Sequence, residues 1–172
     1  MPAAPAIFMA LLPALSGCGW TPLYADPQSG PASAELRAIH VDPIPNRLGQ
    51  RLELALRNSL NPTGEPAKEH YRLQTTLYVG LSNVGLVSSG TSTVGRTDLV
   101  ATYRLIDMKG GAVLQTDTIH SQNSFVLNPN QYSTVVAEYD AGVRSVVELN
   151  DEIVTRLTLF LQDRARQKPK PS

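Results

Sequence analysis

Polar and apolar residues alternate along two stretches in the middle of the chain. The residues on the apolar side are Tyr71, Leu73, Thr75, Leu77, Val79 and Leu81 in the first stretch, and Thr97, Leu99, Ala101, Tyr103 and Leu105 in the second. A period of two is typical of a β-strand with one buried face and one face in water. We therefore predict two such strands, with Arg72 and Arg104 on the solvent-facing side.

Two further strands and their connections are predicted around this pair. Leu36–Val41 is a short apolar strand, and Ala112–Phe125 is a longer strand whose irregular pattern favours a bulge or an edge position. Asp107–Gly111 is a hairpin turn, since its two glycines can adopt positive φ. The nearly uncharged segment Ser82–Gly95 is predicted to be a flexible connection.

Two segments have the period of an amphipathic helix instead. The first begins after Asn46, a good N-cap residue, and repeats a leucine every four residues, at Leu48, Leu52, Leu56 and Leu60. The second runs from Gln131 or Tyr132 to the end of the folded domain. Its apolar stripe contains Val136, Tyr139, Val143, Val146, Ile153, Leu157 and Phe160, interrupted only by Asn150.

The second helix is long and carries charge away from its apolar stripe. We place the ladder Asp140, Arg144 and Glu148 on the other side of the helix, where residues four apart are neighbours. At about 1.5 Å per residue the helix would extend for roughly 50 Å. It is therefore long enough to cross the whole sheet.

The order strand, helix, three strands, long helix excludes a doubly wound parallel sheet. Three consecutive strands with one tight turn favour antiparallel pairing. A sheet with one wet face must bury its other face against the two helices. We predict an α+β two-layer sandwich, in which a four-stranded, largely antiparallel or mixed sheet carries both helices on one face.

The charge balance argues against a nucleic-acid partner. The 172 residues include 15 basic and 15 acidic side chains, which give a formal net charge of zero. A nucleic-acid-binding protein or a polybasic membrane anchor would carry an excess of Lys and Arg. Any anionic ligand must therefore be bound by a local cluster.

The N-terminus contains an apolar segment followed by the single cysteine. Ala6–Leu15 is too short to span a bilayer, which takes about 20 apolar residues, and it is interrupted by Pro13. It has the form of a signal-peptide core, although Met1–Pro5 lacks the usual Lys or Arg. The sequence that follows, Leu15–Cys18, resembles the lipobox of bacterial lipoproteins, in which the cysteine is acylated and becomes the first residue after cleavage. The alternative is that Cys18 is an ordinary free cysteine.

These observations divide the chain into four parts. Residues 1–17 are predicted to be a lipoprotein signal peptide, 18–34 a lipidated tether, 35–166 the folded domain and 167–172 a disordered tail. Acyl chains on Cys18 would hold the domain at a membrane, because each buried methylene contributes about 0.8 kcal/mol. With its only cysteine acylated, the domain would have no disulfide.

No catalytic motif is present, so we do not expect an enzyme. His40, His70 and His120 lie on separate elements and have no metal-binding spacing. The chain contains neither a GxSxG elbow nor a GxxxxGK phosphate loop, and the run Ser88–Thr93 resembles the latter only in composition. The expectation is a binding protein without cofactor or metal.

Several segments, in their order along the chain, resemble one lipoprotein family. After the lipobox come Gly19–Tyr24, Pro45–Arg47, Ala101–Asp107, Val136–Ala141 and Asp151–Leu157. Together they resemble the lipopolysaccharide-assembly lipoprotein family LptE, in its alphaproteobacterial form. The resemblance covers nearly all of the chain after Cys18, and the order and spacing of the segments carry it.

The resemblance implies a location and a partner. Members of this family are outer-membrane lipoproteins that face the periplasm, plug the β-barrel LptD and help it deliver lipopolysaccharide to the outer leaflet. Gly19 is similar to an outer-membrane sorting position. A different periplasmic adaptor lipoprotein, such as the auxiliary component of an inter-membrane lipid transporter, remains the alternative.

The resemblance also implies contact with lipopolysaccharide, whose phosphates need Arg or Lys partners. The candidates in this chain are Arg96 and Lys109, with Arg72 and Arg104 in reserve. The competing interpretation is that all four are ordinary solvated surface charges.

Overall fold

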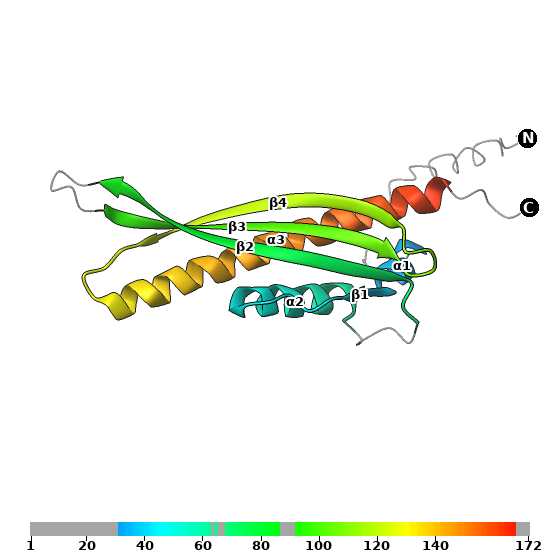
Figure 1. The fold of residues 1–172 in the computed structure, drawn as a ribbon, viewed down its shortest axis with the longest axis horizontal. Coiled ribbons are helices and arrows are strands. Elements are labelled where there is room, and N and C mark those ends of the chain that lie inside the picture. Colours follow the sequence, from blue (N-terminus) through cyan, green and yellow to red (C-terminus); the bar gives the residue numbers. More distant parts are fainter. Residues whose placement is uncertain (1–30, 63, 65–67, 87–91, 168–172) are drawn as a thin grey trace, which may run out of the picture.

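The predicted two-layer α+β sandwich is confirmed by the computed structural model, which describes residues 31–62, 64, 68–86 and 92–167. The elements follow in the order α1 (Pro31–Leu36), β1 (Ile39–Val41), α2 (Arg47–Leu60), β2 (Tyr71–Leu86), β3 (Ser92–Asp107), β4 (Val113–Val126) and α3 (Gln131–Gln167). The sheet order is β1-β2-β3-β4, with β1 parallel to β2 and the other pairs antiparallel. Both long helices lie on one face of the sheet (Figure 1). The predicted signal peptide, Cys18, most of the tether and the residues of the tail after Gln167 lie outside the described residues.

The predicted flexible connection is largely wrong. Residues 82–86 and 92–95 belong to strands, because β2 and β3 stay in antiparallel register past Ser82↔Arg96 as far as Leu86↔Ser92. Only residues 87–91 of that connection are left between the strands, and they lie outside the described residues. Backbone hydrogen bonding to the long neighbouring strand β3 has here outweighed the weak strand propensity of Ser and Asn.

The beginning of the domain also differs from the prediction. Pro31–Leu36 forms a short helix where the end of an extended tether was expected, and proline is well suited to the first position of a helix. Leu36 ends this helix and is buried in the core. The first strand is therefore only Ile39–Val41.

Two expectations for the β3–β4 hairpin are confirmed. Gly111 has φ 66°, and its N–H donates to the Asp107 carbonyl over 2.8 Å, which closes the turn. β4 is an edge strand, and the β3–β4 register shifts at Leu105/Ile106. The expected irregularity therefore lies next to the turn.

The core lies between the helices and the inner face of the sheet. α2 contributes the last three leucines of its predicted repeat, and α3 contributes Val146, Ile153 and Leu157 of its predicted stripe. The sheet contributes the predicted apolar side of β3 and that of β2 from Tyr71 to Leu77. The prediction was wrong for Val79 and Leu81 on β2 and Val136 on α3, which are 36%, 55% and 49% exposed, because α2 does not reach the far end of the sheet (Figure 1). The largest fully buried side chains are Tyr103, Ile39, Ile44, Leu52, Leu56, Leu73, Leu99, Leu105, Leu149, Ile153, Leu157 and Leu161. The opposite face of the sheet is exposed, as the alternating pattern predicts.

α3 runs beside α2 in the same direction. Leu48 packs against Gly142, and Ser59 exchanges hydrogen bonds with Asn150 over 3.1 to 3.3 Å. These pairs hold the helices side by side at both ends of α2. Asn150, which interrupts the apolar stripe, is thereby a partner of α2.

The charged ladder on α3 is exposed and lies away from the buried stripe, as predicted, but two of its residues also contact the sheet. Glu148 accepts a hydrogen bond from the Ser121 hydroxyl at 2.5 Å and from the Asn123 amide at 3.2 Å, both on β4. Arg144 pairs with Asp140 and also donates to the Ser124 carbonyl at 3.3 Å. This side of α3 is therefore its contact with the edge strand.

Candidate functional site

Arg72 and Arg104, two of the predicted ligand-binding residues, lie close together on the outer face of the sheet. Arg72 is opposite Ile106 and Gln74 is opposite Arg104, so the two arginines are diagonal neighbours on adjacent strands. The Arg104 guanidinium donates to the Gln74 side-chain carbonyl over 2.8 Å. The Arg72 guanidinium lies 3.6 Å from the Asp42 carboxylate. Arg72 is therefore already paired with an acidic side chain.

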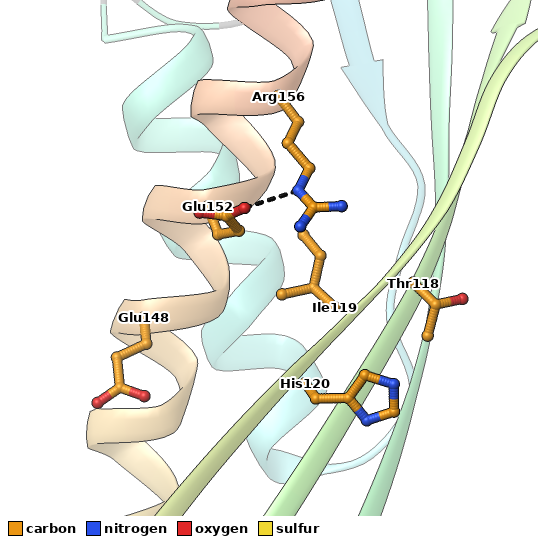
Figure 2. Close-up of a pocket in the computed structure, with 6 residues that line it drawn as sticks. All are labelled: Thr118, Ile119, His120, Glu148, Glu152 and Arg156. Atoms are coloured by element: carbon orange, nitrogen blue, oxygen red, sulfur yellow. Dashed lines mark hydrogen bonds and ion pairs between the residues drawn. The ribbon is translucent and has the colours of Figure 1, made fainter.

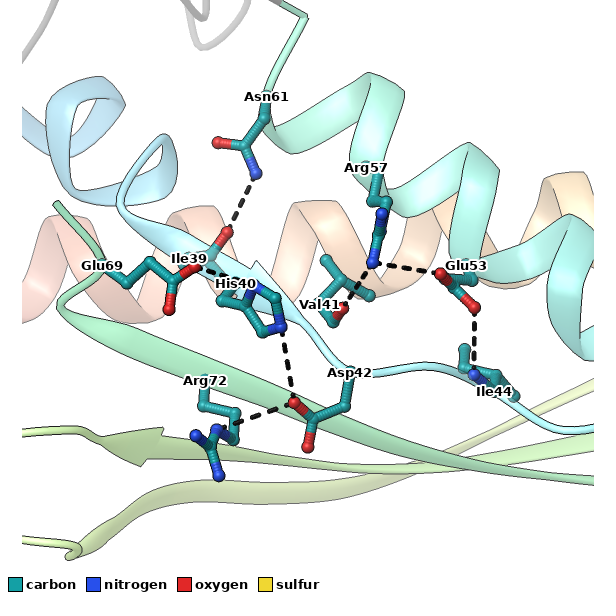
Figure 3. A network of polar contacts seen from close by, with 10 residues as sticks. All are labelled: Ile39, His40, Val41, Asp42, Ile44, Glu53, Arg57, Asn61, Glu69 and Arg72. Carbon is teal, nitrogen blue, oxygen red and sulfur yellow. Dashed lines mark hydrogen bonds and ion pairs between the residues drawn. The ribbon is translucent and has the colours of Figure 1, made fainter. Parts of the chain in front are cut away.

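Figure 3 shows that Arg72 belongs to a polar network at the β1 edge. The His40 imidazole lies between two carboxylates, 2.9 Å from Glu69 and 3.8 Å from Asp42. The network thus contains two acidic groups for one arginine. Its charge does not favour an additional anion.

A second set of contacts in the same view fastens α2 to β1 (Figure 3). Arg57 pairs with Glu53 at 3.2 Å and donates to the Val41 carbonyl at 3.4 Å. The Glu53 carboxylate accepts from the Ile44 N–H at 3.1 Å, and Asn61 donates to the Ile39 carbonyl at 2.9 Å. These groups have a structural role.

Arg96 and Lys109 are not brought together. Arg96 lies near the start of β3 and is 3.7 Å from the Asp98 carboxylate. Lys109 follows Asp107 in the turn at the other end of the same strand. At about 3.3 Å per residue, the length of strand between Arg96 and Asp107 separates them by roughly 35 Å. A single lipid headgroup cannot contact both.

Lys109 lines a pocket at the turn end of the sheet. The pocket has a volume of about 280 Å³ and is lined by Glu35, His70, Tyr71, Asp107, Lys109 and Arg164. Arg164 lies 3.8 Å from Asp107, and the Tyr71 hydroxyl donates to Glu35 at 3.4 Å. The two basic side chains are thus matched by two carboxylates.

The structure instead gathers two arginines that the sequence analysis did not select. Arg47 and Arg51, one turn apart on α2, lie over the ring of Tyr139 on α3, with guanidinium carbons 4.4 and 5.7 Å from the ring centre. Neither has a carboxylate partner among the described residues. Cation–π contacts hold an arginine in place while leaving its N–H donors available.

This arginine pair sits beside exposed apolar side chains. Leu54 on α2 is 59% exposed, and Val136 and Val147 on α3 are 49% and 53% exposed. The helices run side by side in parallel, so Leu54 and Val147 lie at a similar level along them. We call Arg47, Arg51, Tyr139, Leu54 and Val147 the helix-pair surface.

A signal for the helix-pair surface was present in the sequence. Arg47 and Arg51 are four residues apart, and neither has an acidic residue three or four positions away to neutralise it. Two like charges at this spacing repel each other, so they need an external or aromatic partner. The identity of that partner, Tyr139, depends on how the helices pack.

A larger pocket lies between β4 and α3, as shown in Figure 2. It has a volume of about 360 Å³ and is lined by Thr118, Ile119, His120, Glu148, Glu152 and Arg156. Arg156 donates to Glu152 at 2.7 Å and also pairs with Asp117. No contact between His120 and a carboxylate is found among the described residues, so these groups do not form an acid–base pair.

Three groups near this pocket have shifted pKa values. Hydrogen bonds to Glu152 and Asp117 raise the pKa of Arg156, and the hydrogen bond from Arg156 lowers the pKa of Asp117. Burial, with the nearby Asp117 charge, raises the pKa of the Tyr103 hydroxyl to about 12. None of these shifts brings a group towards neutral pH, where proton transfer is most effective.

The described residues contain no group of three or more His, Cys, Asp or Glu side chains placed to hold a metal ion. Among the same residues, no helix combines the length and the apolar character needed to cross a bilayer.

The fold is shared with several solved proteins. A Caulobacter crescentus protein whose crystal structure is described as that of a candidate lipoprotein is 18% identical, with a TM-score of 0.63 over 76% of this chain and 96% of that one. The minor lipoprotein of Acinetobacter baumannii is 14% identical, with a TM-score of 0.58 over 70% of this chain and 90% of that one. A lipoprotein B of Nitrosomonas europaea is 15% identical, with a TM-score of 0.55 over 78% of this chain and 90% of that one.

At such low identity these likenesses establish the fold. The sequence matches no protein-family model and no curated protein. The chain thus has an α+β sandwich fold that also occurs, over nearly their whole length, in proteins described as bacterial lipoproteins.

Proposed function

We propose that this protein is an outer-membrane lipoprotein of the LptE type, anchored through Cys18 and facing the periplasm. In this role it plugs the β-barrel LptD, assists its assembly and binds lipopolysaccharide on its way to the outer leaflet. It acts by binding and carries no catalytic activity. The observation that carries the proposal is the fold shared with the Caulobacter protein over 96% of its length, found in a chain that also has the Leu15–Cys18 motif.

The outer face of the sheet supports the plug role. Along β2 and β3 this face presents uncharged polar groups, such as Gln74, Thr76 and Thr102. Arg72 on this face lies beside the Asp42 carboxylate, and Arg104 donates to the Gln74 side-chain carbonyl. The lumen of a large outer-membrane barrel is lined by polar side chains. A face rich in hydrogen-bonding groups is complementary to such a wall.

The helix-pair surface supports the lipid-binding role. Lipopolysaccharide combines phosphates with acyl chains, and so calls for free guanidinium groups beside apolar area. Arg47 and Arg51 have no carboxylate partner among the described residues, and Leu54 and Val147 are more than half exposed. Arg96 and Lys109 fit this ligand less well, because they lie at opposite ends of a strand.

Copurification tests the partner. The tagged full-length chain, extracted from its native membrane in mild detergent, is expected to bring down one very large β-barrel protein, identified by mass spectrometry. Recovery of an inner-membrane ATPase complex would overturn the LptD assignment and favour the auxiliary lipoprotein of a lipid transporter.

Intact-mass measurement tests the anchor. The native protein is expected to lack residues 1–17 and to carry acyl chains on Cys18. The Cys18→Ala variant is the matched control and should keep its leader and remain unacylated. An unmodified thiol and an uncleaved leader in the native protein would contradict the proposed anchoring.

A further inference from the structure

β2 has a long edge that no other strand of the described residues covers. β1 pairs with only the first three residues of β2, at Ile39↔Tyr71, His40↔Arg72 and Val41↔Leu73. β2 continues to Leu86, and Figure 1 shows it extending to the far end of the sheet, well beyond β1. Among the described residues, the last backbone hydrogen bond on this side is the one that the Asp42 N–H donates to the Leu73 carbonyl at 3.0 Å.

The direction of the backbone groups follows from two hydrogen bonds. The Leu73 carbonyl accepts on the β1 side, whereas the His70 carbonyl accepts from Met108 on the β3 side. Residues of a strand alternate in this respect, so the odd-numbered residues of β2 point their N–H and C=O away from β3. For the exposed residues Val79, Leu81 and Asn83, no hydrogen bond from a described residue reaches these groups.

This edge lacks the features that normally prevent strand pairing. Exposed edges are usually protected by charged side chains, prolines or bulges. From Leu73 to Leu86 the strand has no charged residue and no proline, and its register with β3 runs without a shift as far as Val84↔Val94. Tyr78, Val79 and Leu81 are also 68%, 36% and 55% exposed.

The opposite edge of the sheet shows what protection looks like in the same molecule. β4 carries Asp117, which pairs with Arg156 of α3, and its Ser124 carbonyl accepts from Arg144. α3 therefore covers part of that edge. In contrast, the exposed stretch of β2 is free to pair with an additional strand.

We infer that the β2 edge from Val79 to Asn83 binds an extended, uncharged and apolar segment of a larger partner protein, which adds a strand to the sheet. An uncharged segment fits because the edge has no charge to match, and apolar residues on it would pack beside Val79 and Leu81 on one face and Tyr78 on the other.

A larger partner is favoured over a second copy of this chain. Two short strands side by side bury well below the roughly 1,200 Å² of a stable interface, so this edge alone would give a weak dimer. A segment of a protein that already holds the domain elsewhere gains from its high effective concentration. This inference does not depend on the partner being LptD.

A proline variant tests the contact. Leu81→Pro removes the N–H that faces the open edge and leaves the hydrogen bonds between β2 and β3 intact. Proline also restricts the backbone angles of the residue before it, and here that residue is Gly80, which tolerates the restriction. Leu81→Ala is the control, because it shortens the side chain and keeps the N–H. In the full-length acylated protein extracted in mild detergent, we expect Leu81→Pro to lower the co-extracted partner at least about tenfold, and Leu81→Ala to stay within about twofold.

Hydrogen exchange on the unmodified protein gives a second measurement if Leu81→Pro does not fold. The amides of Val79, Leu81 and Asn83 should exchange fast in the free chain and slowly in the extracted complex, whereas Tyr78 and Gly80 should be slow in both. Equal partner recovery with the two variants, unchanged exchange, a homodimer through this edge, or extraction of the chain alone would each overturn the inference. The identity of the partner, decided by mass spectrometry, tests the LptD proposal separately.

Discussion

The ring of Phe125 lies across the backbone of Gly95, its register partner on the neighbouring strand. A Cβ placed on Gly95 would fall 2.3 Å from Phe125 Cζ and 2.6 Å from Cε2. Phe125 is only 8% exposed, because the missing side chain leaves room for its ring against the sheet. The glycine thus supports the end of the core that lies beyond α2.

Replacing this glycine should destabilise the domain. Gly95→Ala must displace the Phe125 ring, and such overpacking costs about 1–3 kcal/mol. Gly80→Ala is the matched control on β2, since its Cβ would meet nothing closer than 3.4 Å and should change stability by less than about 1 kcal/mol. Urea denaturation of both variants measures the difference, and equal midpoints would contradict the stacking argument.

The start of α2 allows a second substitution test. Asn46 has φ 68° and ψ 167°, a region that favours glycine, and its side chain accepts from the Gly49 N–H at 2.8 Å. Asn46→Ala keeps the unfavourable φ and loses the cap, so we expect a loss of about 1–2 kcal/mol. Asn46→Gly loses the cap but relieves the backbone, and should be the more stable variant in thermal unfolding. The reverse order would show that the φ value carries no strain.

Much of the fold could be predicted because local periodicity and burial agree. The alternation around Leu73 and Leu99 and the leucine repeat of α2 each specify a buried face, and the structure buries those faces, except at Val79 and Leu81 near the far end of β2. The prediction failed where pairing decides the structure. Ser82 and Asn83 are poor strand residues, but their partners on β3 hold them in register, and no local signal reports that.

The candidate site was harder to predict because exposure alone selects too many basic residues. A sequence does not show that Arg72 already has Asp42 beside it, or that Arg96 has Asp98. It also does not show that Gly142 lets Leu48 approach, which brings Arg47 over Tyr139. Both facts depend on contacts between distant segments of the chain.

The buried Tyr103 hydroxyl should make stability fall at high pH. Its pKa is about 12 in the folded protein and about 10 in the unfolded chain, so the folded form holds its proton more tightly. The protonated Tyr103 hydroxyl therefore adds to the free energy of unfolding. This stabilising contribution is fully present below pH about 10 and is lost as the pH rises through about 12. Among the described residues, the only side-chain hydrogen bond to the Tyr103 hydroxyl comes from the Gln115 amide, at 3.0 Å. Tyr103→Phe removes the hydroxyl and with it the titrating group.

The measurement compares the two proteins across this range. The difference in unfolding free energy between wild type and Tyr103→Phe, taken from urea denaturation, should shrink between pH about 10 and about 12. Tyr78→Phe on the exposed face serves as the control and should leave the wild-type slope unchanged. If the unfolding free energy of Tyr103→Phe falls with pH as steeply as that of the wild type, the effect comes from another group.

The helix-pair surface leads to a prediction that rests on the proposed lipid-binding role. In the double variant Arg47→Gln, Arg51→Gln, retention of lipopolysaccharide by the full-length protein should fall at least about tenfold, because each guanidinium–phosphate contact contributes about 1.5–3 kcal/mol. The variant Arg72→Gln, Arg104→Gln removes the same charge from side chains that already have protein partners, and should retain the lipid within about twofold.

The variant Arg96→Gln, Lys109→Gln tests the two residues that the sequence favours as lipid ligands. Since roughly 35 Å separates their ends of β3, this variant should also behave like the wild type. Binding is measured with purified lipopolysaccharide in a filter or sedimentation assay, at constant ionic strength because exposed charges are screened by salt. A larger loss in either control pair than in Arg47→Gln, Arg51→Gln would move the lipid site to the sheet and away from the two helices.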